Sequence, residues 1–328
     1  MSQVRPIQFD QHPLVEQKYI LPTPSIEELY QRVLKIIRLR TPGAIIYAHP
    51  RFGKTYSIRY ILRVLKMDMP GVVTLSFGCR KSKSHSEDMF FATLLHSVGH
   101  PAADSGSIAR KRTRLSERIA ELVERSRYNI VVAFADEAQR LDTIEYEWLR
   151  DVHDELERAG IRMITFLVGQ PQLINQKNAF REARQTQIVS RFMIDEMPFR
   201  GIQSADDLAT CLAGYDESCY PSSSDWTYTR FFFPRAFSDG MRLVSYTEML
   251  WDAFDAAHSA ARFDFGLEVP MQYLARAVEI AFIEYSESDS PSFRFSRAIW
   301  DGCVAASNYV SAQEELRLVM GDGFYEEA

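Results

Sequence analysis

Two hydrophobic patterns alternate along the first two hundred residues. Short runs of mainly apolar residues predict buried strands at 44–47, 72–77, 130–137 and 161–170. Between them, apolar residues recur at helical spacing, and the expected helices cover 25–40, 56–65, 87–98, 108–125 and a stretch around 148–156. This alternation predicts an α/β fold in which helices flank a parallel central sheet.

The rest of the chain has a different pattern. After Pro198-Phe199-Arg200-Gly201, helical spacing dominates over 206–213, 225–238, 242–262, 270–285 and 296–317. We expect an arm at 1–24, packed on the protein or on a neighbouring subunit, an α/β domain at 25–200, a small all-α lid at 201–285, and a linker, C-terminal helix and acidic tail at 286–328. The run Phe231-Phe232-Phe233 is either lid core or a surface for a partner.

The loop after the first expected strand carries a phosphate-binding pattern. It reads His49-Pro50-Arg51-Phe52-Gly53-Lys54-Thr55-Tyr56 and leads directly into a helix. Backbone N–H groups at such a helix start face an anion, the lysine reaches the outer phosphates of a nucleotide, and the threonine hydroxyl ligates Mg²⁺. Ala48 stands where the usual motif has its first glycine. We expect residues 49–56 to bind ATP, with Thr55 as a magnesium ligand.

A second stretch supports the same chemistry. The apolar run Ile130–Ala135 ends in Asp136 and Glu137. Ligands bind outside the C-terminal ends of parallel strands in open α/β sheets. We therefore expect Asp136 to hold Mg²⁺ and Glu137 to polarise the water that attacks the γ-phosphate. Together the two stretches predict a P-loop ATPase.

Two further residues are candidates for contact with the phosphates of the same subunit. Gln170 ends the expected strand 161–170, where a polar side chain can sense the γ-phosphate and orient the water. Its alternative role is to cap the segment that starts at Pro171. Arg242 begins an expected lid helix and can reach back to the phosphates.

Arg191 is the candidate for action on a neighbouring subunit. It lies near the end of the expected α/β domain, where an arginine can supply positive charge to a neighbour's γ-phosphate in trans. Arg181 and Arg184 are rival choices. The alternative is a surface arginine that pairs with Asp195 or Glu196.

Charge is unevenly distributed along the chain. The net charge is −6, yet residues 1–120 carry ten more Lys and Arg than Asp and Glu (19 against 9). Six of the basic residues lie before the helix expected at 87–98 or near the start of the next one: Arg80, Lys81, Lys83, Arg110, Lys111 and Arg112. They either contact the phosphate backbone of DNA or form a solvated face that improves solubility.

The composition argues against several other classes of protein. The hydrophobic fraction of 46% is ordinary for a globular chain and does not indicate disorder. Four cysteines are scattered without C-x-x-C spacing, which favours reduced thiols over a disulfide framework or a zinc site. The start Met1–Pro6 lacks the apolar core of a signal peptide, and no apolar run approaches membrane-spanning length, so we expect a cytoplasmic protein.

In this order, the motifs resemble those of AAA+ ATPases, and specifically of the TnsC/TniB family of transposition regulators, which is related to the initiator clade. The resemblance covers roughly residues 25–285. It rests on Arg51-Phe52-Gly53-Lys54-Thr55, Asp136-Glu137-Ala138-Gln139-Arg140-Leu141, Val168-Gly169-Gln170-Pro171-Gln172-Leu173, Ser190-Arg191-Phe192 and Ser238-Asp239-Gly240-Met241-Arg242.

The resemblance implies ATP-dependent assembly of a homo-oligomer, a ring or helical filament, around double-stranded DNA. The ATP site would lie between subunits, with Arg191 as finger and Arg242 as second sensor. DNA-tracking residues of that family lie where Arg80, Lys81 and Lys83 and residues 110–112 stand here. The assembly would link a target-selection protein to the transposase, and slow hydrolysis, stimulated by DNA or a partner, would disassemble it.

Two other functions fit the same residues. An AAA+ switch could act on a protein partner, as a secretion accessory or signalling protein, without binding DNA. A degenerate P-loop protein could serve only as an interaction module.

Overall fold

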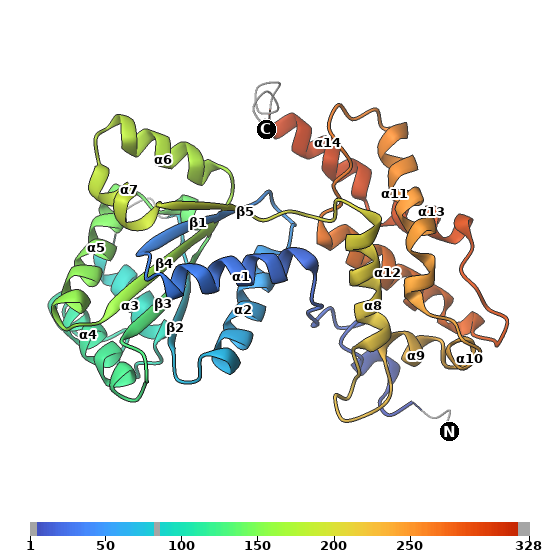
Figure 1. The fold of residues 1–328 in the computed structure, drawn as a ribbon, viewed down its shortest axis with the longest axis horizontal. Coiled ribbons are helices and arrows are strands. Elements are labelled where there is room, and N and C mark those ends of the chain that lie inside the picture. Colours follow the sequence, from blue (N-terminus) through green and yellow to red (C-terminus); the bar gives the residue numbers. More distant parts are fainter. Residues whose placement is uncertain (1–4, 82–85, 321–328) are drawn as a thin grey trace. The chain divides into compact units, whose positions relative to one another are not determined.

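The computed structural model describes residues 5–81 and 86–320 and divides into two compact units (Figure 1). The α/β unit contains residues 28–50 and 54–199. The helical unit contains the described parts of 1–27, 51–53 and 200–328. In the part of the chain that the structure describes, no helix has the length and hydrophobicity needed to cross a bilayer.

A five-stranded parallel sheet forms the centre of the α/β unit, in the order β2-β3-β4-β1-β5. The strands are β1 Gly43–Tyr47, β2 Val73–Gly78, β3 Ile130–Asp136, β4 Arg162–Gly169 and β5 Asp195–Pro198. The first four follow from their apolar runs, and the parallel α/β prediction is confirmed. Strand β5 was not predicted, because only Met197 of its four residues is buried at this sheet edge.

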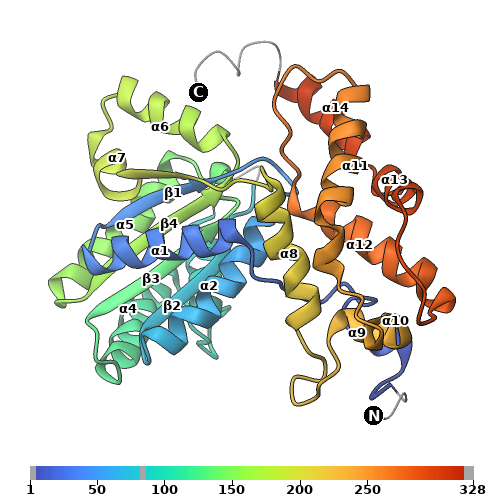
Figure 2. The same cartoon turned by 45° about the vertical axis from the view of Figure 1, so that its right-hand side comes forward.

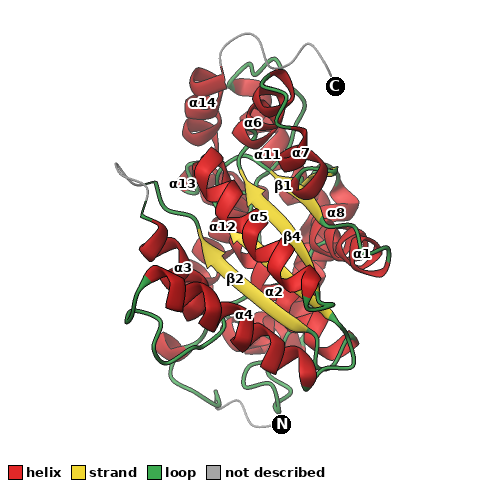
Figure 3. Cartoon of the chain, turned by 90° about the vertical axis from the view of Figure 1, so that its left-hand side faces the viewer, coloured by secondary structure: helices red, strands yellow, loops and turns green. Residues whose placement is uncertain are grey.

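Helices cover both faces of the sheet (Figures 2 and 3). One face carries α1 (Pro24–Arg38) and α2 (Lys54–Asp68), and the other carries α3 (Glu87–Ser97), α4 (Ile108–Glu124) and α5 (Thr143–Arg158). Two shorter helices, α6 (Gln172–Glu182) and α7 (Thr186–Phe192), follow β4. Successive strand residues point to opposite faces, so β3 places Ala133 and Ala135 against α3–α5 and stacks Phe134 on Phe166 beneath the opposite face, with ring centroids 4.9 Å apart.

The helical unit has a second hydrophobic core. Its helices are α8 Ala205–Glu217, α9 Tyr228–Phe232, α10 Pro234–Ser238, α11 Thr247–Ala260, α12 Met271–Tyr285, α13 Arg297–Ala306 and α14 Tyr309–Met320. Short 3₁₀ turns lie at η1 Phe9–Gln11, η2 Ala138–Arg140, η3 Leu243–Tyr246 and η4 Ser286–Ser288, with η2 in the α/β unit.

Two helices that the pattern predicts as continuous are interrupted. The expected helix 225–238 divides at Pro234, which has no N–H to donate to the preceding turn. The expected helix 296–317 divides at Asn308, whose φ of +63° is left-handed. Residues 231–233 are fully buried, so the phenylalanine run belongs to the core of the helical unit.

The N-terminal arm packs against the helical unit. Arg5 Nε donates to the Phe231 carbonyl oxygen at 2.8 Å. The ring of His12 stacks on Phe231 with centroids 4.4 Å apart, and Leu14 and Leu21 are buried in the same core. The arm therefore completes the core of this unit within its own chain.

His12 makes the stability of the helical unit sensitive to acid. Its side chain is fully buried, and Nδ1 accepts from the Leu14 backbone N–H at 3.2 Å. Nε2 has no hydrogen-bond partner among the described residues, so a proton there would be buried and unpaired. Burial accordingly lowers the pKa of His12 to about 4.

We predict that the helical unit loses stability as the pH falls from about 6.5, the pKa of an unfolded histidine, towards 4. In that window the unfolded chain binds a proton that folded His12 does not, which costs about 1.4 kcal/mol per pH unit. Urea unfolding between pH 4.5 and 7 measures it through the fluorescence of Trp226, Trp251 and Trp300. The His12→Phe variant should show a shallower dependence on pH, and an unchanged slope would contradict the assignment.

Candidate functional site

The strand order brings three chain segments to one edge of the sheet. The loop 49–53 follows β1, Asp136 ends β3, and Gln170 follows β4, which lies between β1 and β3. All strands are parallel, so these segments meet at the C-terminal edge, where open α/β sheets bind ligands.

The loop has the backbone conformation of an anion cradle. Arg51 and Gly53 have positive φ values of +73° and +96°. A loop in which residues with positive and negative φ alternate turns successive N–H groups towards a common concavity that suits an anion. Helix α2 begins at the next residue, Lys54, so its N-terminus follows the loop directly. Phe52 is buried, whereas Pro50 and Tyr56 are exposed.

Lys54 is buried at the start of α2. Its ammonium donates to the carbonyl oxygens of Ala48 and His49, both at 2.8 Å. Burial lowers the pKa of Lys54 to about 8, although Glu137 and Asp136 nearby act to raise it. Burial and the charge of Lys54 lower the pKa of His49 to about 4. A buried lysine cation next to a loop of this conformation suits a polyphosphate.

Thr55 and Asp136 supply paired oxygen atoms beside the lysine. Thr55 Oγ1 donates to Asp136 Oδ2 at 2.9 Å, joining the start of α2 to the end of β3. Hydroxyl and carboxylate oxygens are the ligands that Mg²⁺ prefers, and it commonly takes only one or two from protein at a nucleotide site. These two side chains therefore fit the expected magnesium site.

Glu137 is held in an uncommon conformation. Its φ is +58°, which non-glycine residues seldom adopt. Oε2 of its carboxylate accepts from Gln139 Nε2 at 2.9 Å and lies 3.4 Å from Arg140 Nη2. Sequence reasoning did not single out Gln139; its place two residues after Glu137, in the turn η2, was the available signal.

Gln170 connects to the same network through its backbone. Its N–H donates to Gln139 Oε1 at 3.2 Å, and its side chain is partly exposed at the C-terminal end of β4. The position agrees with the expected place of a phosphate-sensing residue. Contact of its side chain with a phosphate stays a prediction.

Arg191 lies at the opposite edge of the sheet. A Cβ on Gly43, the first residue of β1, would lie 2.4 Å from the Arg191 carbonyl oxygen, so α7 packs directly on the start of this strand. The loop 49–53 follows the other end of β1, about 13 Å away at the rise of a strand. Arg191 is therefore remote from the phosphate-binding loop of its own chain.

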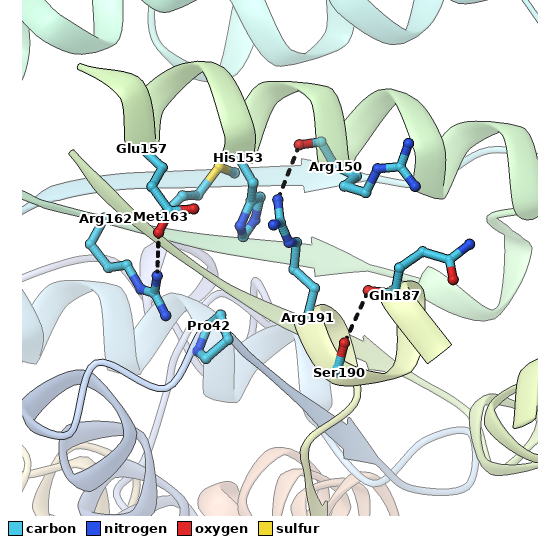
Figure 4. A pocket seen from close by; sticks show the side chains of 9 residues that line it. All are labelled: Pro42, Arg150, His153, Glu157, Arg162, Met163, Gln187, Ser190 and Arg191. Carbon is cyan, nitrogen blue, oxygen red and sulfur yellow. Dashed lines mark hydrogen bonds and ion pairs between the residues drawn. The ribbon is translucent and has the colours of Figure 1, made fainter. Parts of the chain in front are cut away.

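A pocket of about 270 Å³ surrounds Arg191 (Figure 4). Arg150, Arg162, Gln187 and Ser190 are among its lining residues. The Arg191 guanidinium pairs with Asp154 and donates to the Arg150 carbonyl oxygen at 3.4 Å. The alternative expected from the sequence was a pairing with Asp195 or Glu196, whereas the carboxylate that the structure pairs with Arg191 is Asp154.

The rival arginines belong to the α/β unit, and the expected second sensor belongs to the helical unit. Arg181 and Arg184 are exposed at the end of α6 and just beyond it. Arg242 belongs to the helical unit, where it donates to the carbonyl oxygens of Phe237 and Met241 and lies 3.7 Å from the centre of the Phe237 ring. Arg51, also in that unit, donates to the Tyr273 hydroxyl at 2.7 Å.

The six expected DNA contacts divide into three groups. Arg80 and Lys81 after β2 and Arg110 on α4 are exposed. Lys83 lies outside the described residues.

Lys111 and Arg112 both form ion pairs within the α/β unit, and the burial of Lys111 corrects the expectation for that residue. Lys111 is 1% exposed, and its ammonium pairs with Asp88 at 2.8 Å. Arg112 pairs with Glu87 at 2.6 Å and Asp151 at 3.0 Å. These ion pairs join α3, α4 and α5. Breaking the pair of the buried Lys111 would leave an uncompensated charge, so Lys111 is not available for DNA. Arg112 is partly exposed and already holds two carboxylates, and its contact with DNA stays a prediction. The acidic first turn of α3 was the signal that sequence reasoning missed.

Comparison with known proteins identifies the fold. Residues 24–176 match the AAA domain family. The structure of the Aeropyrum pernix ORC2 protein in ADPNP–ADP complexes superposes with a TM-score of 0.59 at 15% identity, covering 90% of this chain and 71% of that one.

Two other solved structures superpose less well. The Aeropyrum pernix ORC1 protein in complex with DNA gives a TM-score of 0.44 at 14% identity, covering 91% of this chain and 86% of that one. Domain III of the Thermotoga maritima replication initiation protein DnaA gives 0.44 at 10% identity, covering 89% and 95%. No curated protein sequence matches.

The parallel sheet, the loop 49–56 and the matched domain agree with one another. The chain has the AAA+ P-loop NTPase fold with a helical C-terminal part, and the protein is an ATPase.

Proposed function

We propose that ATP is bound and hydrolysed at the edge of the sheet where β1, β3 and β4 end. The hydrogen bond between Thr55 and Asp136 carries this assignment, because it joins the phosphate-binding helix to the strand that ends in carboxylates. Lys54 would meet the outer phosphates. Thr55 and Asp136 would hold Mg²⁺, which, when bound, neutralises phosphate charge.

Hydrolysis transfers the γ-phosphoryl group to water. The water oxygen bonds to phosphorus, the bond to the leaving ADP oxygen breaks, and the water's proton passes to the phosphate product. Glu137 orients the water, while Lys54 compensates the negative charge on the phosphates. Gln170 follows β4, the strand that lies between β1 and β3, where it can report the presence of the γ-phosphate.

Two substitutions separate binding from hydrolysis. We predict that Lys54→Ala weakens ATP binding by about ten- to a hundredfold, since a hydrogen bond to a charged group contributes roughly 1.5–3 kcal/mol. Glu137→Gln should keep ATP affinity within about threefold and lower turnover by about a hundredfold or more. Fluorescent-ATP titration and phosphate release with duplex DNA measure the two effects. Lys66→Ala, an exposed lysine on the same helix, is the control.

Arg191 supports an oligomer whose ATP sites are shared between subunits. It lies beside the N-terminal end of β1 and the ATP loop follows the C-terminal end, so its side chain cannot serve both ends within one chain. We assign it to the γ-phosphate of a neighbouring subunit, where it supplies positive charge. The surrounding pocket, with Arg150 and Arg162, is the surface that would face that neighbour.

Mixing two inactive variants tests this arrangement. Glu137→Gln keeps Arg191, and Arg191→Ala keeps Glu137, so a mixed oligomer contains interfaces in which both residues are intact. We predict low turnover for each variant alone and recovered turnover for the mixture, measured as phosphate release against mixing ratio. Failure of the mixture to exceed either variant would place Arg191 outside the neighbour's site. Arg181→Ala tests the rival arginine, and alone it should keep the parental turnover.

We further propose that the oligomer forms on double-stranded DNA and regulates transposition, connecting a target-selection protein to the transposase. The resemblance to TnsC/TniB proteins supports the transposition role. The exposed Arg80, Lys81 and Arg110 support the DNA contact, because phosphate neutralisation needs accessible cations. A switch acting on a protein partner is the other outcome of the test below.

Charge reversal at these three positions tests the DNA contact. We predict that the triple change to Glu weakens ATP-dependent binding to duplex DNA of any sequence. It should also reduce the slope of log Kd against log salt by about 0.9 for each lost phosphate contact. The matched control reverses Arg59, Arg63 and Lys66, which are exposed on α2. Equal loss in both variants, or no loss in either, would favour a protein partner.

A further inference from the structure

The amide of Gln139 bridges two strand ends in the α/β unit. Its Nε2 donates to Glu137 Oε2 at 2.9 Å, at the end of β3, and its Oε1 accepts from the Gln170 N–H at 3.2 Å, at the end of β4. The two hydrogen bonds use both ends of one planar group. The amide therefore links the backbone of Gln170 to the carboxylate of Glu137.

The chemistry of the partners fixes the orientation of this amide. A backbone N–H only donates, and a carboxylate only accepts. Rotating the amide by half a turn would oppose donor to donor and oxygen to carboxylate. A side chain with one donor and one acceptor of this length satisfies both partners, which neither glutamate nor methionine can do.

Gly169 leaves the space that the amide occupies. A Cβ at this position would lie 2.2 Å from Gln139 Oε1 and 2.8 Å from a methyl group of Leu173. Its φ is not in the left-handed region, so the requirement for glycine here is one of space. The last residue of β4 and the bridging amide therefore fit each other.

Gln139 is the uncharged side chain that donates a hydrogen bond to the Glu137 carboxylate, and charged groups lie around the same carboxylate. Asp136 precedes Glu137 and accepts from its backbone N–H, Arg140 lies 3.4 Å from its carboxylate, and Lys54 is near enough for Glu137 to act to raise the pKa of that lysine. The left-handed backbone of Glu137 is a conformation that persists when neighbouring contacts hold it. The turn η2 and the amide of Gln139 supply such contacts.

We propose that Gln139 is a positioning residue for ATP hydrolysis. It holds Oε2 of Glu137, directs Oε1 to the attacking water, and ties this carboxylate to the strand end that carries Gln170. The inference rests on the role of Glu137 proposed above. Gln139 itself touches neither ATP nor the water.

Two substitutions at position 139 test the bridge. Gln139→Met is close in shape and removes both hydrogen bonds, whereas Gln139→Glu keeps an acceptor for the Gln170 N–H and opposes a carboxylate to Glu137. We expect both to lower kcat by about ten- to a hundredfold, the cost of misplacing a reacting group, with the Kd for ATP within about twofold of the parent. Single-turnover phosphate release measures the rate of hydrolysis, and fluorescent-ATP titration measures the Kd for ATP.

A double-substitution cycle distinguishes positioning from a general structural role. In the Glu137→Gln background, Gln139→Met should lower the residual rate by no more than about twofold, because the group it positions has already been replaced. Gln172→Glu adds the same charge at the exposed start of α6 and should leave kcat within about twofold. Thermal melting of each variant shows that it is folded.

The outcomes separate the two proposals. If Glu137→Gln retains parental turnover, the proposed role of Glu137 fails. If Glu137→Gln stops turnover while both Gln139 variants keep the parental kcat, only the present inference is overturned. Full multiplicative loss in the double variant also overturns it, because Gln139 would then act independently of Glu137.

Discussion

Parallel pairing of β1, β4 and β3 is the constraint on which the chemistry of this chain depends. Because the three strands run in one direction, their ends deliver an ammonium, a hydroxyl and two carboxylates to one edge. The hydrogen bond from Thr55 to Asp136 depends on that pairing, because it joins the helix that follows β1 to the end of β3. It crosses β4, so the register of three strands must hold for a single contact of 2.9 Å to form.

The same strand direction separates the two charged regions of the α/β unit. One end of β1 leads into a loop that suits phosphate, and its other end packs on α7, which carries Arg191. Within one chain these regions are held apart by the length of a strand. In the proposed oligomer, each copy would present one region to the next.

Much of the fold could be predicted from the sequence because strongly apolar runs and a glycine-lysine-threonine triplet are local signals. Strand β5 escaped because an edge strand needs few buried residues, and Met197 alone gives no pattern. The misassigned Lys111 shows a different limit. Its basic neighbours indicated an exposed face, but its burial depends on Asp88, which lies 23 residues earlier and is brought close only by packing of α3 on α4.

The site shows the same limit at shorter range. Lys54, Thr55 and Asp136 were recognised from their motifs, and the structure brings them together. Gln139 belongs to the motif at the end of β3, yet its partner Gln170 is 31 residues away, and the hydrogen bond exists only because β3 and β4 are neighbours. A residue that acts by positioning another residue has no motif with a fixed spacing by which the sequence alone could reveal it.

The absence of a side chain at Gly43 has a consequence for how such an assembly could vary. The strand contacts the backbone of α7 with no atom between them, so even one methyl group there would shift the helix that carries Arg191. Such a subunit would keep its own nucleotide pocket intact while serving its neighbour poorly. The strength of communication around a ring or along a filament could thus be tuned at a position that touches neither nucleotide nor nucleic acid.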